Sequence, residues 1–87
     1  MLKEDVAMTE VWRPIKGYEG AYEVSNTGKA RSIDRYDRRG FFHKGVELKI
    51  RRYEDERFIR LTTNGQSKDR SLDRIFYTTF SEEERLL

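Results

Sequence analysis

The sequence has no cysteine, one histidine and one proline in 87 residues, and it contains no long hydrophobic run. Without cysteine it can form neither a disulfide nor a thiolate zinc site, and it has no cysteine nucleophile. A single histidine leaves no set of His and Cys ligands for a metal ion. The N-terminal residues MLKEDVAMTE lack an apolar targeting stretch, and no window approaches a membrane span. We therefore expect an intracellular, cytoplasmic protein with no cofactor and no metal site.

The sequence is rich instead in charged and aromatic residues. Charged residues make up 39% of the chain and hydrophobic residues 36%, and the aromatics comprise Trp12, five Tyr and five Phe. A buried aromatic side chain removes a large apolar area from water, so that a short chain can still build a core. Residues 1–10 have no periodicity and are expected to form a flexible N-terminal tail. Residues 11–87 are expected to form a single domain.

Positive charge is concentrated in the middle of the chain. Residues 29–52 carry nine basic and three acidic side chains, whereas residues 1–28 and 53–87 each have a net charge of −2. Lys and Arg neutralise phosphates, so this segment is suited to a polyanionic partner. A solvated, arginine-rich surface loop is the alternative explanation. The mixture of Arg, Tyr and Phe is also typical of protein–protein interfaces, and composition alone leaves both kinds of partner open.

Turn residues between short alternating segments predict a first hairpin. Residues 22–24 form one strand, residues 26–28 a tight turn, and residues 29–33 the returning strand. Residues 34–45 are charged and interrupted by glycine, which predicts a mobile loop.

Further strands and one helix are predicted after this loop. Residues 46–51 alternate between apolar and charged side chains, as in a half-buried strand with a basic outer face. Residues 58–63 form the next strand, followed by a hairpin turn at Asn64-Gly65. Apolar residues recur at helical spacing after Asp73, which is available as a helix N-cap. The pattern predicts an α+β fold, in which a small antiparallel sheet of about four to five short strands packs against one C-terminal helix.

The Asn64-Gly65 turn also predicts a register. A two-residue loop places Arg60 opposite Asp69, where the two side chains can form a cross-strand ion pair. The same register, however, places the basic side chains Lys68 and Arg70 on the face that carries Ile59 and Leu61. A register shifted by one residue would remove this conflict.

The residues show no catalytic arrangement. His43 is the only histidine and lies in the basic loop, where a solvated role is the simpler explanation. The acidic runs 54–56 and 82–84 are consecutive, so their carboxylates diverge rather than forming a pair for acid–base catalysis. No glycine-rich phosphate loop precedes a helix, and no serine nucleophile turn is present. The sequence predicts a binding protein rather than an enzyme.

One stretch closely resembles a known motif. The spacing is Trp12-x-x-Ile15-x-Gly17-Tyr18-Glu19-Gly20-x-Tyr22-x-Val24-Ser25-Asn26-x-Gly28, with Ser32 beyond it. It resembles the type-four NUMOD motif, a modular DNA-binding segment at the N-terminus of phage and intron-encoded HNH homing endonucleases. The match covers roughly residues 10–33, and Ala30 stands where the family commonly has a larger aliphatic residue. The Gly, Tyr and Ser-Asn residues are expected to build the hairpin, with Trp12, Tyr18, Tyr22 and Val24 in the core.

The resemblance continues more weakly towards the C-terminus. In those endonucleases a strand–turn–strand hairpin leads into the segment that opens the nuclease site, and LDRIFYTTF at residues 72–80 falls in the same order. The family's first catalytic histidine, a general base, aligns with Asp73. The family's later Asn and second His lie beyond the position of Phe80, and the seven residues that follow here include neither. Because a carboxylate with a pKa of about 4 is a weak base at neutral pH, the resemblance implies no DNA cleavage.

The resemblance therefore implies a non-catalytic DNA-binding module derived from a phage HNH homing-type endonuclease, which would place it in the host cytoplasm. The residues expected to contact duplex DNA are the basic ones of the middle segment: Arg31, Arg35, Arg38, Arg39, Lys44, Lys49, Arg51 and Arg52. The alternative is a small phage protein that uses an inactive nuclease scaffold to inhibit a host protein, such as a defence nuclease or a transcription component. A nuclease completed by a partner chain is a third hypothesis. A homodimer that pairs edge strands also remains open.

Overall fold

The computed structural model describes residues 9–86 and contains three antiparallel sheets and one helix in this range. The N-terminal sheet consists of β1 (Trp12–Pro14), β2 (Tyr22–Ser25) and β3 (Ala30–Ser32). A separate hairpin pairs β4 (Arg35–Tyr36) with β5 (Phe42–His43). The C-terminal sheet consists of β6 (Arg51–Tyr53), β7 (Glu56–Thr63) and β8 (Gln66–Ser71), and helix α2 follows at Leu72–Thr79. The predicted α+β class, with short antiparallel strands and one C-terminal helix, is confirmed.

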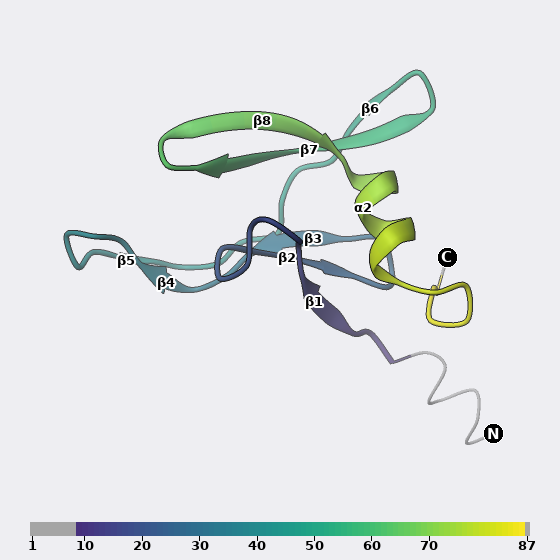
Figure 1. The fold of residues 1–87 in the computed structure, drawn as a ribbon, viewed down its shortest axis with the longest axis horizontal. Helices are drawn as coiled ribbons and strands as arrows, with labels where there is room; N and C mark the ends of the chain where they lie inside the picture. The colour runs from purple at the N-terminus through teal and green to yellow at the C-terminus, as the bar shows by residue number, and fades with distance from the viewer. Residues whose placement is uncertain (1–8, 87) are drawn as a thin grey trace.

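The two three-stranded sheets lie side by side, and α2 lies at one end of both (Figure 1). The buried cluster between them draws on all three elements: Ile15, Tyr18, Tyr22, Val24, Ala30, Ile59, Leu61, Leu72, Phe76 and Phe80. A polar contact also links β7 to β2, because the Thr62 amide donates to the Tyr22 hydroxyl at 3.1 Å. Tyr18, Tyr22 and Val24 are core residues, as expected. Trp12 is only partly buried and lies outside this cluster.

The structure has the register that places Arg60 opposite Asp69, and the one-residue shift considered from the sequence is wrong. Both turn residues have positive φ, 52° and 78°, as a two-residue hairpin loop requires, and Arg60 lies opposite Asp69. Ile59 therefore faces Arg70 across the hairpin. The conflict with burial disappears because β8 is an edge strand, which is exposed along nearly its whole length. The Arg70 guanidinium reaches past the core and donates to the Tyr18 hydroxyl at 3.3 Å.

Three sequence expectations are wrong in detail. Segment 46–50 is not a half-buried strand: it touches β3 through one bridge, between Glu47 and Arg31, and of its apolar residues only Leu48 packs on the core. Segment 34–45 is not an open loop but contains the β4–β5 hairpin. Helix α2 begins two residues earlier than expected, because Ser71 rather than Asp73 is its N-cap and accepts from the Arg74 amide at 3.2 Å.

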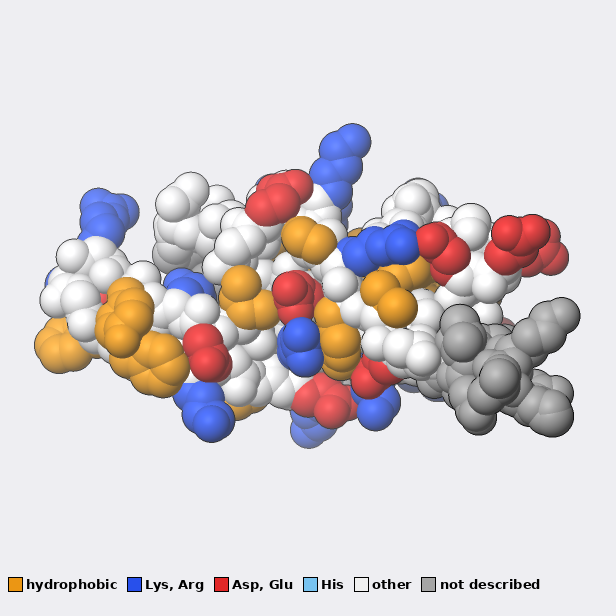
Figure 2. All heavy atoms as spheres, turned by 90° about the horizontal axis from the view of Figure 1, so that it is seen from below, with side chains coloured by type: hydrophobic (Ala, Val, Ile, Leu, Met, Phe, Trp, Pro, Cys, Tyr) orange, Lys and Arg blue, Asp and Glu red, His pale blue; other side chains and the backbone are white. Residues whose placement is uncertain are grey.

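The β4–β5 hairpin projects from one end of the molecule, at the left of Figure 1, and α2 lies towards the other end. It contributes no residue to the buried cluster, and its Tyr36 and Phe42 remain exposed. Figure 2 shows these hydrophobic side chains gathered on the surface at that end of the molecule. The expected N-terminal tail at 1–10 lies outside the described residues except for Thr9 and Glu10. Both of these contact the β2–β3 turn, since the Asn26 amide donates to the Thr9 carbonyl and the Thr27 hydroxyl to Glu10.

Candidate functional site

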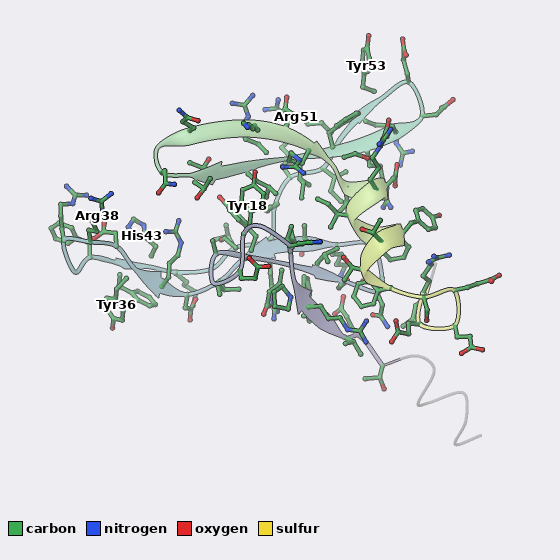
Figure 3. All side chains as sticks on the ribbon, viewed as in Figure 1. Tyr18, Tyr36, Arg38, His43, Arg51 and Tyr53 are labelled. Atoms are coloured by element: carbon green, nitrogen blue, oxygen red, sulfur yellow. The ribbon has the colours of Figure 1, made fainter. Side chains whose placement is uncertain are left out.

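A groove of about 720 Å³ separates the β4–β5 hairpin from the β7–β8 turn. Its walls are Arg35, Asp37, Arg38, Arg39 and His43 on the hairpin and Thr62, Asn64 and Gly65 on the turn. Arg35 and His43 are opposite each other across the hairpin, so their side chains share a face. Figure 3 shows Arg38 and His43 on the side of the hairpin that faces the C-terminal sheet, and Tyr36 on the opposite side. The groove therefore brings three of the predicted arginines together.

The two acidic residues at the hairpin, Asp37 and Asp34, form hydrogen bonds within it and at its base. The Asp37 carboxylate accepts from the His43 ring at 2.9 Å and from the backbone amides of Arg39 and Phe41. These bonds, that from His43 first, lower the pKa of Asp37 to about 2. Asp34 accepts from the Gly45 amide at 2.7 Å. Both carboxylates thus stabilise the ribbon and its base.

The arginines of the groove differ in how they are held. Arg39 lies 3.5 Å from Asp37 and stacks over the Phe41 ring at 4.9 Å. Arg35 and Arg38, in contrast, form no ion pair with any residue between 9 and 86. Both are exposed. Their guanidinium groups are available to an anionic ligand without first breaking an internal bond.

The remaining predicted cations are spread over other parts of the surface. Lys44 follows β5, Lys49 lies in the irregular segment, and Arg51 and Arg52 lie on β6; all four are exposed. Figure 3 shows Arg51 over the C-terminal sheet, away from Arg38. The structure thus does not gather these four into the groove.

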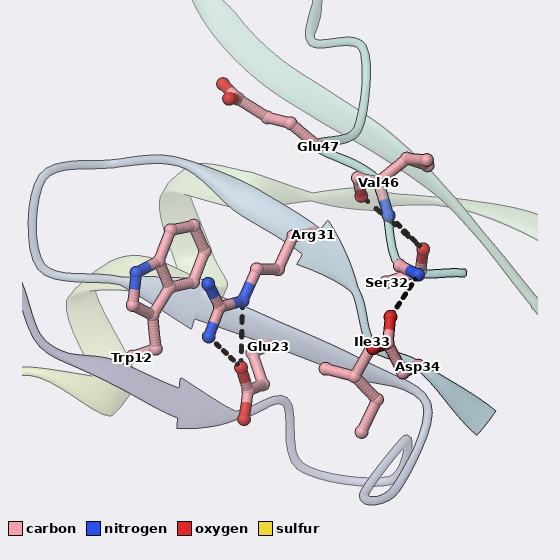
Figure 4. A pocket seen from close by; sticks show the side chains of 9 residues that line it. Trp12, Glu23, Arg31, Ser32, Ile33, Asp34, Val46 and Glu47 are labelled. Atoms are coloured by element: carbon pink, nitrogen blue, oxygen red, sulfur yellow. Dashed lines mark hydrogen bonds and ion pairs between the residues drawn. The ribbon is translucent and has the colours of Figure 1, made fainter.

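Arg31 is engaged within the molecule. Its guanidinium lies 3.9 Å from the Trp12 ring centroid and donates to Glu23 at 2.7 Å. Figure 4 shows this arrangement in a hollow of about 660 Å³, whose wall also includes the carboxylates of Asp34 and Glu47. With three carboxylates around one neutralised arginine, this hollow does not favour an anion.

The Ser-Asn pair of the motif is buried and holds the fold together. The Ser25 hydroxyl accepts from the amides of Thr27 and Lys29 and so shapes the turn after β2. The Asn26 side chain accepts from the Val11 amide at 2.9 Å and donates to the Glu84 carbonyl at 3.0 Å. Asn26 is 4% exposed and therefore joins β1, the turn and the C-terminal segment from inside the protein.

Asp73 forms the most shielded ion pair in the described part of the chain. One carboxylate oxygen accepts from the Arg57 guanidinium at 2.8 Å and the other from the Arg57 backbone amide at 2.9 Å. The Arg57 guanidinium also donates to the Gly28 carbonyl, which ties β7 and α2 to the β2–β3 turn. Burial raises the pKa of Asp73, but the bonds from Arg57 and the nearby charge of Arg52 outweigh it, and the net pKa is lowered.

Among residues 9–86, no three His, Cys, Asp or Glu side chains converge in a way that could hold a metal ion. No helix in the same range is long and apolar enough to cross a membrane.

Comparison with known proteins identifies the family. The family model of the NUMOD4 motif matches residues 10–84, which is most of the chain. The chain belongs to the NUMOD4 motif family. The match reaches well beyond residues 10–33, where the sequence resemblance is most evident, and includes the hairpin, the C-terminal sheet and α2.

A solved structure is similar to this NUMOD4 chain. It is described as "DNA binding and cleavage by the HNH homing endonuclease I-HmuI", with 35% sequence identity and a TM-score of 0.63. The similarity covers 80% of the NUMOD4 chain but only 36% of the endonuclease chain. No curated protein matches the sequence.

Five residues of the groove in this NUMOD4 chain were not predicted from the sequence: Asp37, His43, Thr62, Asn64 and Gly65. Alternation along a β4–β5 hairpin would have placed His43 beside Arg35, had residues 34–45 been interpreted as strands rather than a loop. The Asn64-Gly65 turn was predicted, but nothing in the sequence indicates that it lies next to a hairpin some 25 residues earlier. Arg57, the partner of Asp73, gave no local signal at all.

Proposed function

We propose that this chain is a non-catalytic DNA-binding module, derived from a phage HNH homing-type endonuclease, that holds duplex DNA at the groove beside the β4–β5 hairpin. The observation that carries the proposal is the convergence of Arg35, Arg38 and Arg39 at one groove whose single carboxylate, Asp37, is already bonded within the hairpin. Membership of the NUMOD4 family and similarity to an endonuclease described as binding DNA support it.

The shape of the hairpin suits a nucleic-acid groove. It is a two-stranded ribbon that projects from the body of the protein (Figure 1). A two-stranded ribbon fits the major groove of B-DNA, which is about 12 Å wide. The fork of donors on each guanidinium can bond two phosphate or guanine oxygens at once. The Cα atoms extend over 48 Å along the longest axis of the molecule, which corresponds to about 14 base pairs at roughly 3.4 Å each.

Arg35 and Arg38 are the strongest candidates for direct contact, because neither has to break an ion pair with residues 9–86 before it binds a phosphate. Arg39 contributes after its 3.5 Å contact with Asp37 is exchanged for a phosphate. Lys44, Lys49, Arg51 and Arg52 form additional exposed positive charge that a curved or longer duplex can reach. Arg31 is the weakest candidate, since contact with DNA would break both its Glu23 bond and its stacking on Trp12.

The absence of catalysis in this proposal rests on Asp73. A general base must be able to take up a proton at neutral pH. Both oxygens of Asp73 accept bonds from Arg57, and its pKa is lowered further from neutrality. In this chain the carboxylate therefore acts as a structural link between β7 and α2.

The test is binding of a labelled duplex of about 30 base pairs, longer than the estimated footprint, over a series of salt concentrations. The double variant Arg35→Gln/Arg38→Gln is compared with Lys16→Gln/Arg74→Gln, which removes the same charge from exposed sites outside the hairpin. Loss of two phosphate contacts should reduce the slope of log affinity against log salt by about 1.8 and weaken binding roughly 10- to 60-fold near 0.1 M salt. The control pair should change the slope by well under one unit.

Two results would overturn the proposal. If the wild-type protein does not bind duplex at about 50 mM salt, the module does not recognise paired duplex DNA. A nuclease-treated lysate would then be searched for a host protein that it captures. If supercoiled plasmid is nicked in Mg²⁺ or Mn²⁺ and Asp73→Ala abolishes the nicking, the protein is a nuclease.

A further inference from the structure

The β4–β5 hairpin has two chemically different faces. Arg35 and His43 share the face that lines the groove, whereas Tyr36 and Phe42 form a cross-strand pair on the other face. The ring centroids of this aromatic pair are 5.3 Å apart and the ring planes are inclined by 57°. Tyr36 is 71% exposed and Phe42 52% exposed, and the patch is visible at the hairpin end of Figure 2.

Folding accounts for only a small part of the aromatic pair, since a cross-strand aromatic contact contributes about 0.2–1 kcal/mol to a hairpin. Neither ring belongs to the buried cluster. The hairpin is held by other contacts, the bonds of Asp37 with His43 and of Asp34 with the Gly45 amide. Because both rings stay largely exposed, their burial contributes little free energy to folding. They add an apolar surface to a region that is otherwise charged. A surface of this kind is available to a ligand.

The size and surroundings of the pair favour a nucleobase over a protein. A full aromatic side chain offers about 150–250 Å², so the exposed parts of the two rings amount to roughly 200–300 Å². A stable protein interface needs about 800 Å² on each partner. The ribbon that carries the rings also carries Arg35, Arg38, Arg39 and Lys44, and both of its acids are internally bonded. A nucleotide needs one ring face for its base and one cation for its phosphate, and both are present.

We propose that Tyr36 and Phe42 stack on unpaired bases of the bound nucleic acid, so that the module prefers DNA with a locally opened duplex. This inference rests on the proposed function and specifies which DNA is recognised. Rings inclined by 57° cannot slide together between parallel base pairs, which are about 3.4 Å apart. Unpaired bases rotate freely and can each meet one ring, as in proteins that bind single strands.

The stacking predicts a measurable preference. One stacked base contributes about 1–3 kcal/mol by side-chain removal, which corresponds to roughly 5- to 150-fold in affinity. The wild-type protein should therefore bind a duplex containing a bubble of about four unpaired nucleotides at least fivefold more tightly than the fully paired duplex of the same length. Both probes carry the same number of phosphates, so the ratio of their affinities cancels the contribution of the arginines.

The variant that tests the rings is Tyr36→Leu/Phe42→Leu, with Tyr53→Leu as the matched control. Tyr53 is 67% exposed, and Figure 3 shows it on the other side of the molecule from Tyr36, beside the β6–β7 turn. The double variant should bind both probes with nearly equal affinity, whereas Tyr53→Leu should retain the preference. A thermal melt should show all three proteins equally folded, because the replaced rings are exposed. A 2-aminopurine in the bubble should be quenched by the wild-type protein but not by the double variant.

The outcomes separate the two proposals. Equal wild-type affinity for paired and bubbled duplex overturns the stacking inference and leaves duplex binding intact. A preference that survives in Tyr36→Leu/Phe42→Leu also overturns it, because other residues then recognise the bubble. Binding to the bubbled probe alone supports stacking but contradicts recognition of paired duplex. Binding to neither probe overturns both.

Discussion

Removal of the Asp73 carboxylate should destabilise the protein far more than removal of a similar carboxylate on the sheet surface. Two Asp–Arg pairs near the C-terminal sheet differ both in exposure and in the number of bonds to the carboxylate. In the Asp73–Arg57 pair the side chains are 27% and 16% exposed, and in the Asp69–Arg60 pair they are 48% and 54% exposed. The pairs therefore compare a partly buried carboxylate that accepts two bonds with an exposed carboxylate that forms one contact.

The magnitude follows from the bonds lost. Asp73→Ala removes the acceptor for two Arg57 donors at 2.8 and 2.9 Å, and a hydrogen bond to a charged group contributes about 1.5–3 kcal/mol. It also removes a negative charge from the first turn of α2, which contributes about 0.3–1 kcal/mol. Partial access of water to the pair reduces this sum, so we expect a loss of about 2–4 kcal/mol. Asp69→Ala breaks one exposed contact at 3.3 Å and should cost about 0–1 kcal/mol.

The assay is urea and thermal unfolding of wild type and both variants. For a domain of this size, 1 kcal/mol shifts the melting temperature by about 4–8 °C, so Asp73→Ala should melt at least 8 °C lower. A double-mutant cycle with Arg57→Met, which keeps an unbranched apolar stem, isolates the coupling between the two side chains. A low native pKa means that Asp73 stabilises the fold above the unfolded-state pKa of about 4 and loses this effect as pH falls below it. The difference in the free energy of unfolding between wild type and Asp73→Asn should therefore become smaller at acid pH.

The reasoning is refuted if Asp73→Ala costs no more than Asp69→Ala. The bonds from Arg57 would then contribute nothing, and Asp73 would be free to act on a ligand or a water molecule. The structural assignment and the absence of catalysis would fail together.

Three further predictions concern residues that shape the module. Asn26→Ala should lower the free energy of unfolding in urea by about 2–3 kcal/mol, because the Val11 amide and the Glu84 carbonyl lose their bonds to the buried Asn26 side chain. Gln66→Ala, which removes an exposed amide, should lower it by less than about 0.5 kcal/mol. Gly45→Ala would press a methyl group against the backbone of β3, and we expect lower thermal stability and a displaced hairpin, visible as amide chemical-shift changes. Arg13 first, then the Ser81 amide, lowers the pKa of Glu84 to about 2 from 4.5, so its stabilising effect is full above about pH 5 and lost as pH falls towards 2. The pH profile of Glu84→Gln should accordingly be flatter over this range, and an unchanged profile would contradict the assignment.

The parts of the fold that could be predicted from the sequence are those fixed by neighbouring residues. Positive φ at Asn64 and Gly65 admits few residue types, so the turn and the Arg60–Asp69 register were readable. The α+β class followed from the change of hydrophobic period near Leu72. These features depend on contacts within a few residues along the chain.

The errors arose where distant contacts decide the structure. The alternation at 46–50 is genuine, but a strand needs a partner along its length, and β3 offers this segment a single bridge. The β4–β5 hairpin was missed because each strand has two residues, too few for periodicity to reveal. The sequence predicts a helix cap at Asp73 because it gives no sign that Arg57, sixteen positions earlier, donates a hydrogen bond to each of its carboxylate oxygens.

The motif and the hairpin consequently have different roles in recognition. The motif side chains that the sequence made most conspicuous are buried or bonded: Tyr18 and Tyr22 in the core, Ser25 in the turn, and Asn26 between the chain ends. A side chain with no free surface cannot distinguish one ligand from another, and its replacement lowers the stability of the module for every ligand equally. Discrimination must come from exposed groups on a supported element, which here are the two faces of the β4–β5 hairpin. Substitutions at Arg35 and Tyr36 should therefore change affinity and preference at constant stability, and substitutions in the motif should do the reverse.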